Sequence, residues 1–116
     1  MIVCAIDDLM FSVKVKTTAT ALGADVYFAR TPGQVLASIR ERQPSLVVFD
    51  LNSARLEPLA VVAAMQADGA LRDIATIGYV SHVDTATIAA ARQAGVGQVL
   101  ARSAFVERLA EILTSA

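Results

Sequence analysis

MIVCAIDD at residues 1–8 and LVVFD at residues 46–50 share one pattern, an apolar run that ends in aspartate. Neither run alternates apolar with polar side chains, which is typical of strands that are buried on both faces, as the central strands of a parallel sheet are. The two segments therefore predict central strands at residues 1–6 and 46–49. If these strands are neighbours and run in the same direction, their aspartates lie at the same edge of the sheet.

Three more short apolar runs predict strands at residues 25–29, 75–80 and 98–101, and stretches with helical spacing separate the strands. A series of five strand-then-helix units predicts a parallel sheet that helices cover on both faces. Five units are too few for a closed eight-stranded barrel. We therefore expect an α/β fold, a flavodoxin-like doubly wound sheet of five strands in the order 2-1-3-4-5 with five helices.

Local signals mark the ends of the expected helices, the third of which spans residues 58–66. Gly23 ends the first helix. Thr31 caps the second, Pro32 takes its first position and Gln43-Pro44 ends it. Asp84 caps the fourth helix, which ends before Gly95, and Ser103 caps the last. The residues expected to face the core are Phe11, Val15, Thr18, Ala19 and Leu22, then Val35, Leu36 and Ile39, then Leu59, Val62 and Ala63, and finally Phe105, Leu109, Ile112 and Leu113.

The composition narrows the class of protein. The chain has 116 residues, of which 55% are hydrophobic, so we expect one domain over residues 1–116 without an output domain. The formal net charge of −1 gives no reason to expect a nucleic-acid or membrane surface. The opening apolar run is too short for a membrane span and lacks the basic flank of a signal peptide. The single cysteine, Cys4, lies inside a predicted strand, which favours an inert thiol in a reducing cytoplasm.

Three aspartates follow the two central strands: Asp7 and Asp8 come after the first, and Asp50 comes after the third. Neighbouring strands are about 4.8 Å apart, so we expect the three carboxylates to lie close together. Like charges at that distance repel each other, and a divalent cation such as Mg²⁺, which prefers hard oxygen ligands, relieves the repulsion. An aspartate at such a site can also act as a nucleophile toward phosphorus. Each of the three also has an ordinary structural role, as a helix cap, a solvated loop residue or a turn former.

Two further strand ends carry polar side chains. Ser81 follows the fourth strand and offers a hydroxyl, and Arg102 follows the fifth and offers a fixed positive charge. Phosphoryl transfer depends on positioning and on charge neutralisation, which a hydroxyl and a cation facing the aspartates supply. The ordinary alternatives are a turn residue for Ser81 and a surface ion pair for Arg102. We interpret His82 as a solvated loop residue.

With these features the chain resembles the receiver domains of two-component response regulators over essentially its whole length. The matching residues are Asp7-Asp8, the Val47–Asp50 run, Ser81 and Ala94-Gly95. The resemblance implies a phosphoacceptor at Asp50, and Mg²⁺ held by Asp7 or Asp8, by Asp50 and by the backbone carbonyl of Asn52. It also implies that Ser81 meets the phosphoryl group and that a phosphohistidine on a histidine kinase or phosphotransfer protein is the donor.

The chain departs from the receiver pattern at five positions. Arg102-Ser103 stands where the family has lysine-proline, and Val99 stands where an aromatic residue usually couples to the switch hydroxyl. Ala54 replaces a typical proline and Pro58 a typical glycine. The acceptor and metal residues are therefore present, whereas the residues that relay the signal are altered. Arginine is planar and forked, so it does not simply replace a compact ammonium group.

Three functions remain open. The first is a phosphoacceptor, in which the face formed by the fourth helix, fifth strand and fifth helix changes its protein partner. The second is a pseudo-receiver, a binding module that partners recognise through the same face without phosphorylation. The third is a flavodoxin-like cofactor-binding protein or phosphatase. The acidic loop after the first strand disfavours a flavin site, because it repels phosphate unless a metal ion intervenes. The adjacent Asp7 and Asp8 disfavour a phosphatase with an aspartate nucleophile, in which the two aspartates are usually two positions apart. In the first two readings the protein is not an enzyme. Exposed apolar surface at Val96, Val99 and the last helix would allow the chain to form a homodimer.

Overall fold

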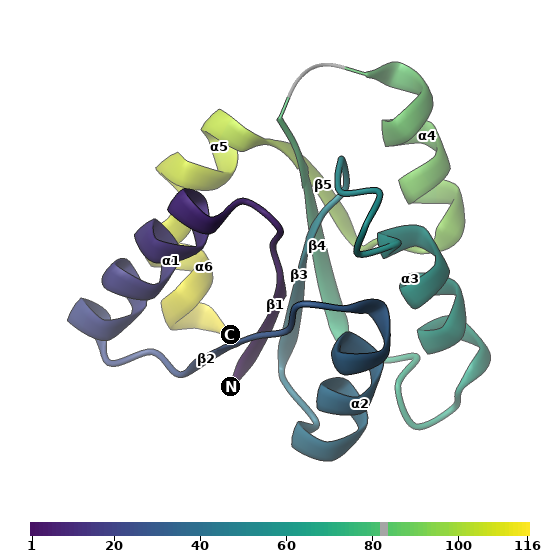
Figure 1. Cartoon of the computed structure of the whole chain (residues 1–116), viewed down its shortest axis with the longest axis horizontal. Helices are drawn as coiled ribbons and strands as arrows, with labels where there is room; N and C mark the ends of the chain where they lie inside the picture. Colours follow the sequence, from purple (N-terminus) through teal and green to yellow (C-terminus); the bar gives the residue numbers. More distant parts are fainter. Residues whose placement is uncertain (82–83) are drawn as a thin grey trace.

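A five-stranded parallel sheet forms the centre of the computed structural model, which describes residues 1–81 and 84–116 (Figure 1). The strands lie in the order β2-β1-β3-β4-β5, which confirms the predicted topology. The strands are β1 (Ile2–Ala5), β2 (Val26–Phe28), β3 (Leu46–Asp50), β4 (Ala75–Val80) and β5 (Gln98–Ala101). The helices are α1 (Leu9–Leu22), α2 (Pro32–Arg42), α3 (Pro58–Ala67), α4 (Thr85–Ala94), α5 (Arg102–Glu107) and α6 (Leu109–Ser115).

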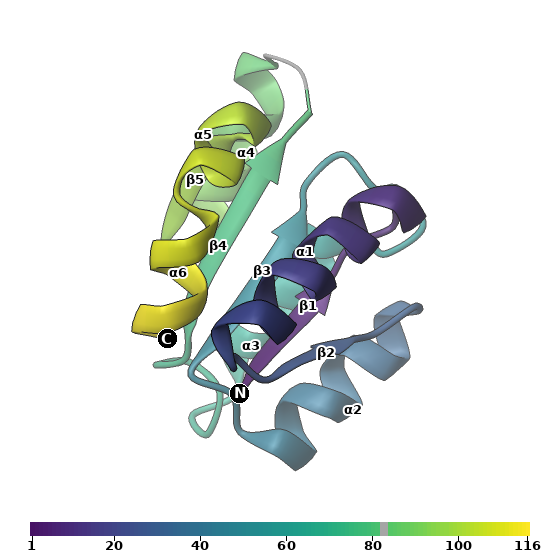
Figure 2. The ribbon, with the colours of Figure 1, turned by 90° about the vertical axis from the view of Figure 1, so that its left-hand side faces the viewer.

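Helices cover both faces of the sheet, with α1, α5 and α6 on one face and α2, α3 and α4 on the other (Figure 1). α1 and α6 are in contact on their face of the sheet (Figure 2). Side chains of a strand point alternately to the two faces, and each face has its own apolar core. Phe11, Tyr79 and Phe105 belong to the core under α1, α5 and α6, whereas Phe49 and Met65 belong to the opposite core. β1 and β3 are buried along their whole length, and they are apolar except for Asp50 at the end of β3.

Short-range hydrogen bonds form most helix ends as the sequence predicts. The side chains of Asp8, Thr31 and Asp84 accept hydrogen bonds from backbone N–H groups in the first turns of α1, α2 and α4. Gly23 and Gly95 end α1 and α4 in the left-handed conformation, which glycine adopts without a steric penalty. Within the described residues, no helix is both long and apolar enough to cross a membrane. Burial raises the pKa of the Cys4 thiol to about 12, as expected for an inert cysteine.

The last helical segment differs from the prediction. Ser103 is not its cap: α5 begins one residue earlier, at Arg102, and no side chain caps it. The segment also bends at Arg108, where ψ is 7°, so the described chain contains six helices instead of five. Backbone hydrogen bonds from Arg108 N–H to Ala104 and from Ile112 N–H to Arg108 continue across the bend. These two bonds flank the bend, and Phe105, Leu109, Ile112 and Leu113 are buried as predicted.

Three residues lie elsewhere than the sequence predicts. Leu22 is 42% exposed because it is the last residue of α1 and lies at the edge of the packed face. Ala63 is exposed because the buried side of α3 is formed by Val61, Val62 and Met65. Val96 is buried in the core under α2, α3 and α4, so it does not contribute to an exposed surface for self-association.

Candidate functional site

The strand register brings the acidic residues to one edge of the sheet. β1 pairs with β3 in parallel, with Ala5 opposite Phe49, so the neighbouring strands and shared direction that the sequence predicts are confirmed. β4 lies on the other side of β3, with Tyr79 opposite Asp50. Asp7 and Asp8 therefore leave β1 at the edge where Asp50 ends β3.

Asp50 is the most enclosed of the three aspartates, with only 8% of its surface exposed. Its Oδ1 accepts a hydrogen bond of 3.1 Å from the backbone N–H of Asn52. Its Oδ2 makes no hydrogen bond to any residue that the structure describes. Burial raises the pKa of Asp50, and the negative charges of Asp7 and Asp8 raise it further, against the opposing effects of the Asn52 N–H and Arg102.

Asp7 is held by two residues of the loop between β3 and α3. Nη2 of Arg55 donates to its Oδ1 at 2.6 Å and Nε donates to the same oxygen at 3.1 Å. The hydroxyl of Ser53 donates to Oδ2 at 2.9 Å. These hydrogen bonds, that of Arg55 foremost, hold the pKa of Asp7 below its ordinary value. Neither partner was predicted from the sequence, although Arg55 lies only five residues after Asp50 and so could reach the acidic strand ends.

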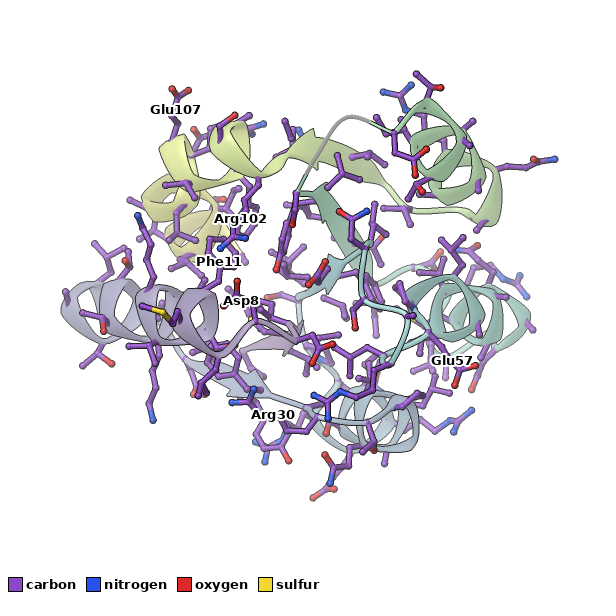
Figure 3. The ribbon with its side chains drawn as sticks, turned by 45° about the horizontal axis from the view of Figure 1, so that its top comes forward. Asp8, Phe11, Arg30, Glu57, Arg102 and Glu107 are labelled. Carbon is purple, nitrogen blue, oxygen red and sulfur yellow. The ribbon has the colours of Figure 1, made fainter. Side chains whose placement is uncertain are left out.

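Asp8 has both a structural and an electrostatic role. Its Oδ1 caps α1 by accepting from the N–H of Phe11 at 3.1 Å, and its Oδ2 is 3.4 Å from Nη2 of Arg102. The Phe11 N–H is the main reason that the pKa of Asp8 is lowered, and Arg102 adds to the effect. The guanidinium of Arg102 also lies over the Phe11 ring, with 4.1 Å from Cζ to the ring centroid. Figure 3 shows Arg102 facing Asp8 and Phe11, whereas Arg30 and Glu57 lie away from them.

The ends of β3 and β4 are tied together by Asn52 and Ser81. The side-chain oxygen of Asn52 accepts a hydrogen bond of 2.6 Å from the backbone N–H of Ser81. The resemblance implied a role for the backbone carbonyl of Asn52, and the side chain adds a structural role to it. Ser81 is exposed at the rim of the site. His82 lies outside the described residues.

Aromatic side chains form the floor of the site. The Tyr79 ring packs between those of Phe11 and Phe105, at centroid distances of 5.1 and 5.2 Å. Tyr79 is 1% exposed, and among residues 1–81 and 84–116 its hydroxyl is the only buried side-chain nitrogen or oxygen without a hydrogen-bond partner. Tyr79 was not predicted as a site residue, although alternation along the strand places it on the same face as Ser81, two residues later.

Arginines are the counter-ions of the acidic site in this structure. Arg55 pairs with Asp7 and Arg102 with Asp8. Among the described residues, no group of three or more histidine, cysteine, aspartate or glutamate side chains is arranged to hold a metal ion. The donor chemistry still suits Mg²⁺, because carboxylate and carbonyl oxygens are its preferred ligands. A cation that binds here therefore competes with two guanidinium groups.

Comparison with known proteins shows similarity of fold without detectable similarity of sequence family. No protein-family model matches the chain, and no curated protein matches it. The chemotaxis protein CheY4 of Vibrio cholerae is 15% identical, with a TM-score of 0.84 over 98% of this chain and 95% of that one. The magnesium-coordinated receiver domain of the sensor histidine kinase PA1611 from Pseudomonas aeruginosa is 16% identical, with a TM-score of 0.81 over 99% and 97%.

A third similar structure is the Mn²⁺-bound response regulator Rcp1, which is 18% identical, with a TM-score of 0.77 over 98% of this chain and 88% of that one. Each of the three similarities extends over nearly the whole chain. This chain therefore has the fold of the receiver domains of response regulators.

Proposed function

We propose that this chain is a single-domain, receiver-like signalling protein in which Asp50 accepts a phosphoryl group. The observation that carries the proposal is the state of the Asp50 carboxylate. One oxygen is fixed by the Asn52 N–H, the other has no protein partner among the described residues, and the residue keeps 8% of its surface exposed. A nucleophile needs this combination of fixed orientation and one free oxygen.

The residues around Asp50 suit an in-line transfer from a phosphohistidine. Oδ2 of Asp50 attacks phosphorus, a P–O bond forms, and the electron pair of the P–N bond returns to the imidazole nitrogen of the donor. Arg102 lowers the negative potential that Asp7 and Asp8 create at Asp50. The exposed hydroxyl of Ser81 lies at the rim, where it can donate to a phosphoryl oxygen. The donor is a histidine kinase or a phosphotransfer protein, and we place the exchange in the cytoplasm.

Mg²⁺ belongs to the same proposal. Asp7 or Asp8, Asp50 and the backbone carbonyl of Asn52 would hold it, and the bound ion would offset negative charge on the phosphoryl oxygens. Two proteins of the same fold are described as Mn²⁺-bound and magnesium-coordinated, which supports the choice of a divalent cation. In this chain Asp7 and Asp8 must exchange part of their contact with Arg55 and Arg102 for contact with the ion.

Incubation with a small-molecule phosphodonor and Mg²⁺, followed by intact-mass measurement, tests the proposal. The wild-type protein should gain the mass of one phosphoryl group, and Asp50→Asn should not, because the amide is not a nucleophile. Asp73→Asn, which changes an exposed aspartate away from the site, should gain the same mass as the wild type. A gain that persists in Asp50→Asn would contradict the assignment of Asp50.

The second candidate is a pseudo-receiver that binds partners without phosphorylation. The arginine pairs of Asp7 and Asp8 favour it, because they neutralise the site without a metal ion. Val99 and Arg102, which depart from the receiver pattern, point the same way. If the wild-type protein gains no mass with any phosphodonor or divalent ion, this reading replaces the first.

In both readings the protein partner binds the face formed by α4, β5 and α5. A homodimer through this face remains a prediction, which light scattering can test.

A further inference from the structure

Tyr79 combines complete burial with an unused hydrogen-bonding group. Its ring is enclosed by Phe11 and Phe105, yet its hydroxyl has no partner among the described residues. A buried polar group that loses its water without gaining another partner reduces the stability of the fold. Phenylalanine would fill the same space without this cost. Packing alone therefore does not explain why residue 79 is a tyrosine and not a phenylalanine.

The register places Tyr79 beside Asp50. Tyr79 lies directly opposite Asp50 on the neighbouring strand, and cross-strand partners project from the same face of a sheet. The Phe11 ring, which packs on Tyr79, also carries the guanidinium of Arg102. Arg102, Phe11 and Tyr79 are therefore linked by direct contacts beneath Asp8 and Asp50.

The protonation state of Tyr79 makes its hydroxyl a donor. Burial raises the pKa of the phenol well above its ordinary value of 10.0, and the charge of Asp50 raises it further. The hydroxyl thus keeps its proton at neutral pH and can offer it to an acceptor. Its partner on the neighbouring strand is Asp50, whose Oδ2 is also without a hydrogen-bond partner among the described residues.

We propose that the Tyr79 hydroxyl is a hydrogen-bond donor to an oxyanion carried by or bound at Asp50, and thus a positioning residue for the phosphoryl group. This inference rests on the proposed function of Asp50. The proposed donor, Tyr79, is buried in β4 and is separate from Ser81, which is exposed. The oxyanion would supply the partner that the buried hydroxyl lacks in the unmodified protein.

Beryllofluoride, a tetrahedral mimic of a phosphoryl group that binds carboxylate oxygens, is the probe. In the presence of Mg²⁺, Tyr79→Phe should bind it about tenfold to a hundredfold more weakly than the wild type, because a hydrogen bond to a charged group is lost. The unfolding temperature of unmodified Tyr79→Phe should be equal to or higher than that of the wild type. Tyr27→Phe is the matched control, because Tyr27 lies on the edge strand β2 under Arg42, and it should bind like the wild type.

A spectroscopic readout keeps the test independent of the Tyr79→Phe variant. The chain has two tyrosines and no tryptophan, so Tyr79 is the only phenol in Tyr27→Phe. Its absorption should shift to longer wavelength when beryllofluoride binds, as a phenol that begins to donate a hydrogen bond does. Equal affinity in wild type and Tyr79→Phe, with no absorption shift, would overturn the role of Tyr79 and leave Asp50 as the acceptor. Failure of the wild type to bind the probe would overturn both proposals.

Discussion

Asp50 carries its charge in a nearly enclosed position, and two other carboxylates act on it. Asp7 and Asp8 differ from it because each has an arginine and a hydrogen-bond donor of its own. The pKa of Asp50 is raised and those of Asp7 and Asp8 are lowered, so the three residues respond in opposite ways to pH. Ionised Asp50 reduces the stability of the fold, whereas ionised Asp7 and Asp8 add to it.

Replacement of Asp50 by asparagine should therefore stabilise the protein near neutral pH. We expect a gain of roughly 1 kcal/mol in the free energy of unfolding, the ordinary size of a single-residue effect. A carboxyl group with a raised pKa imposes its penalty above the folded pKa, and the penalty disappears below the ordinary value of 3.8, where both states are protonated. The gain should shrink as the pH falls and vanish below that value.

Urea denaturation of the wild type and Asp50→Asn across this pH range measures the difference. Asp73→Asn is the control, because Asp73 is exposed and its replacement should change stability little at any pH. Since Asp7 and Asp8 are present in all three proteins, their own loss of stability in acid cancels from the comparison. A gain that is independent of pH would show that burial of the Asp50 charge is not its cause.

At the scale of elements, the sheet and the loop after β3 meet at Gly78 of β4. A Cβ atom at Gly78 would lie 2.6–2.9 Å from the side chain of Leu51, which follows Asp50 directly. The absence of a side chain at Gly78 thus lets Leu51 turn inward and pack against β4, where it is 7% exposed. This packing positions the start of the loop that carries Asn52, Ser53 and Arg55.

Gly78→Ala should destabilise the protein by about 1–3 kcal/mol, the usual cost of overpacking. Leu51→Ala should also destabilise it, because it leaves a cavity. The double variant should lose less than the sum of the two single losses, since alanine at position 78 occupies the space that Leu51 vacates. Thermal and urea denaturation of the four proteins complete the cycle.

Gly33→Ala provides the contrasting control for this cycle. Gly33 lies in α2 with no atom within 4 Å of a Cβ built there, so alanine should be neutral or stabilising through its higher helix propensity. If Gly78→Ala behaves like Gly33→Ala, then Leu51 does not need the space at Gly78. Strictly additive losses in the double variant would lead to the same conclusion.

The ends of elements differ in how far the sequence predicted them. Asp8, Thr31, Asp84, Gly23 and Gly95 were identified because a cap depends on a residue and its neighbours three or four positions away. The prediction that Ser103 caps the last helix was wrong, because the start of α5 depends on where β5 ends. The bend at Arg108 had no local signal, because neither glycine nor proline lies there.

At the scale of the whole molecule, the site is assembled from distant parts of the chain. The Asp7–Arg55 contact joins residues 48 positions apart, and the Asp8–Arg102 contact joins residues 94 positions apart. The loop after β1, the loop after β3 and the first residue of α5 must all be in place for both pairs to form. The charge balance of the site is thus a property of the complete fold.

Removal of Arg55 should make the site a better cation site. Arg55→Gln frees the Asp7 carboxylate, so Mg²⁺ should bind about two- to fivefold more tightly, in line with the modest strength of an exposed ion pair. Bound Mg²⁺ stabilises the native state, so at a given Mg²⁺ concentration the rise in unfolding temperature should be larger in Arg55→Gln than in the wild type.

Arg40→Gln is the matched control for this comparison, because it removes an exposed ion pair, Arg40–Asp68, that lies outside the site. It should respond to Mg²⁺ like the wild type. An equal response in Arg55→Gln and the wild type would contradict the competition between Arg55 and the metal ion. No response in any of the three proteins would favour the pseudo-receiver reading.

The strands, the strand order and the approach of Asp7 and Asp8 to Asp50 could be predicted from the sequence alone. Strands that are buried on both faces have unbroken apolar runs, and such runs are visible in the sequence. Arg102 was predicted to face the aspartates from its place after the fifth strand. The pairing of Arg55 with Asp7 and the unpartnered hydroxyl of Tyr79 were not predicted, because they depend on distances between side chains on different elements. These distances are set when the sheet and its helices pack together, so only the tertiary structure determines the electrostatics of the site.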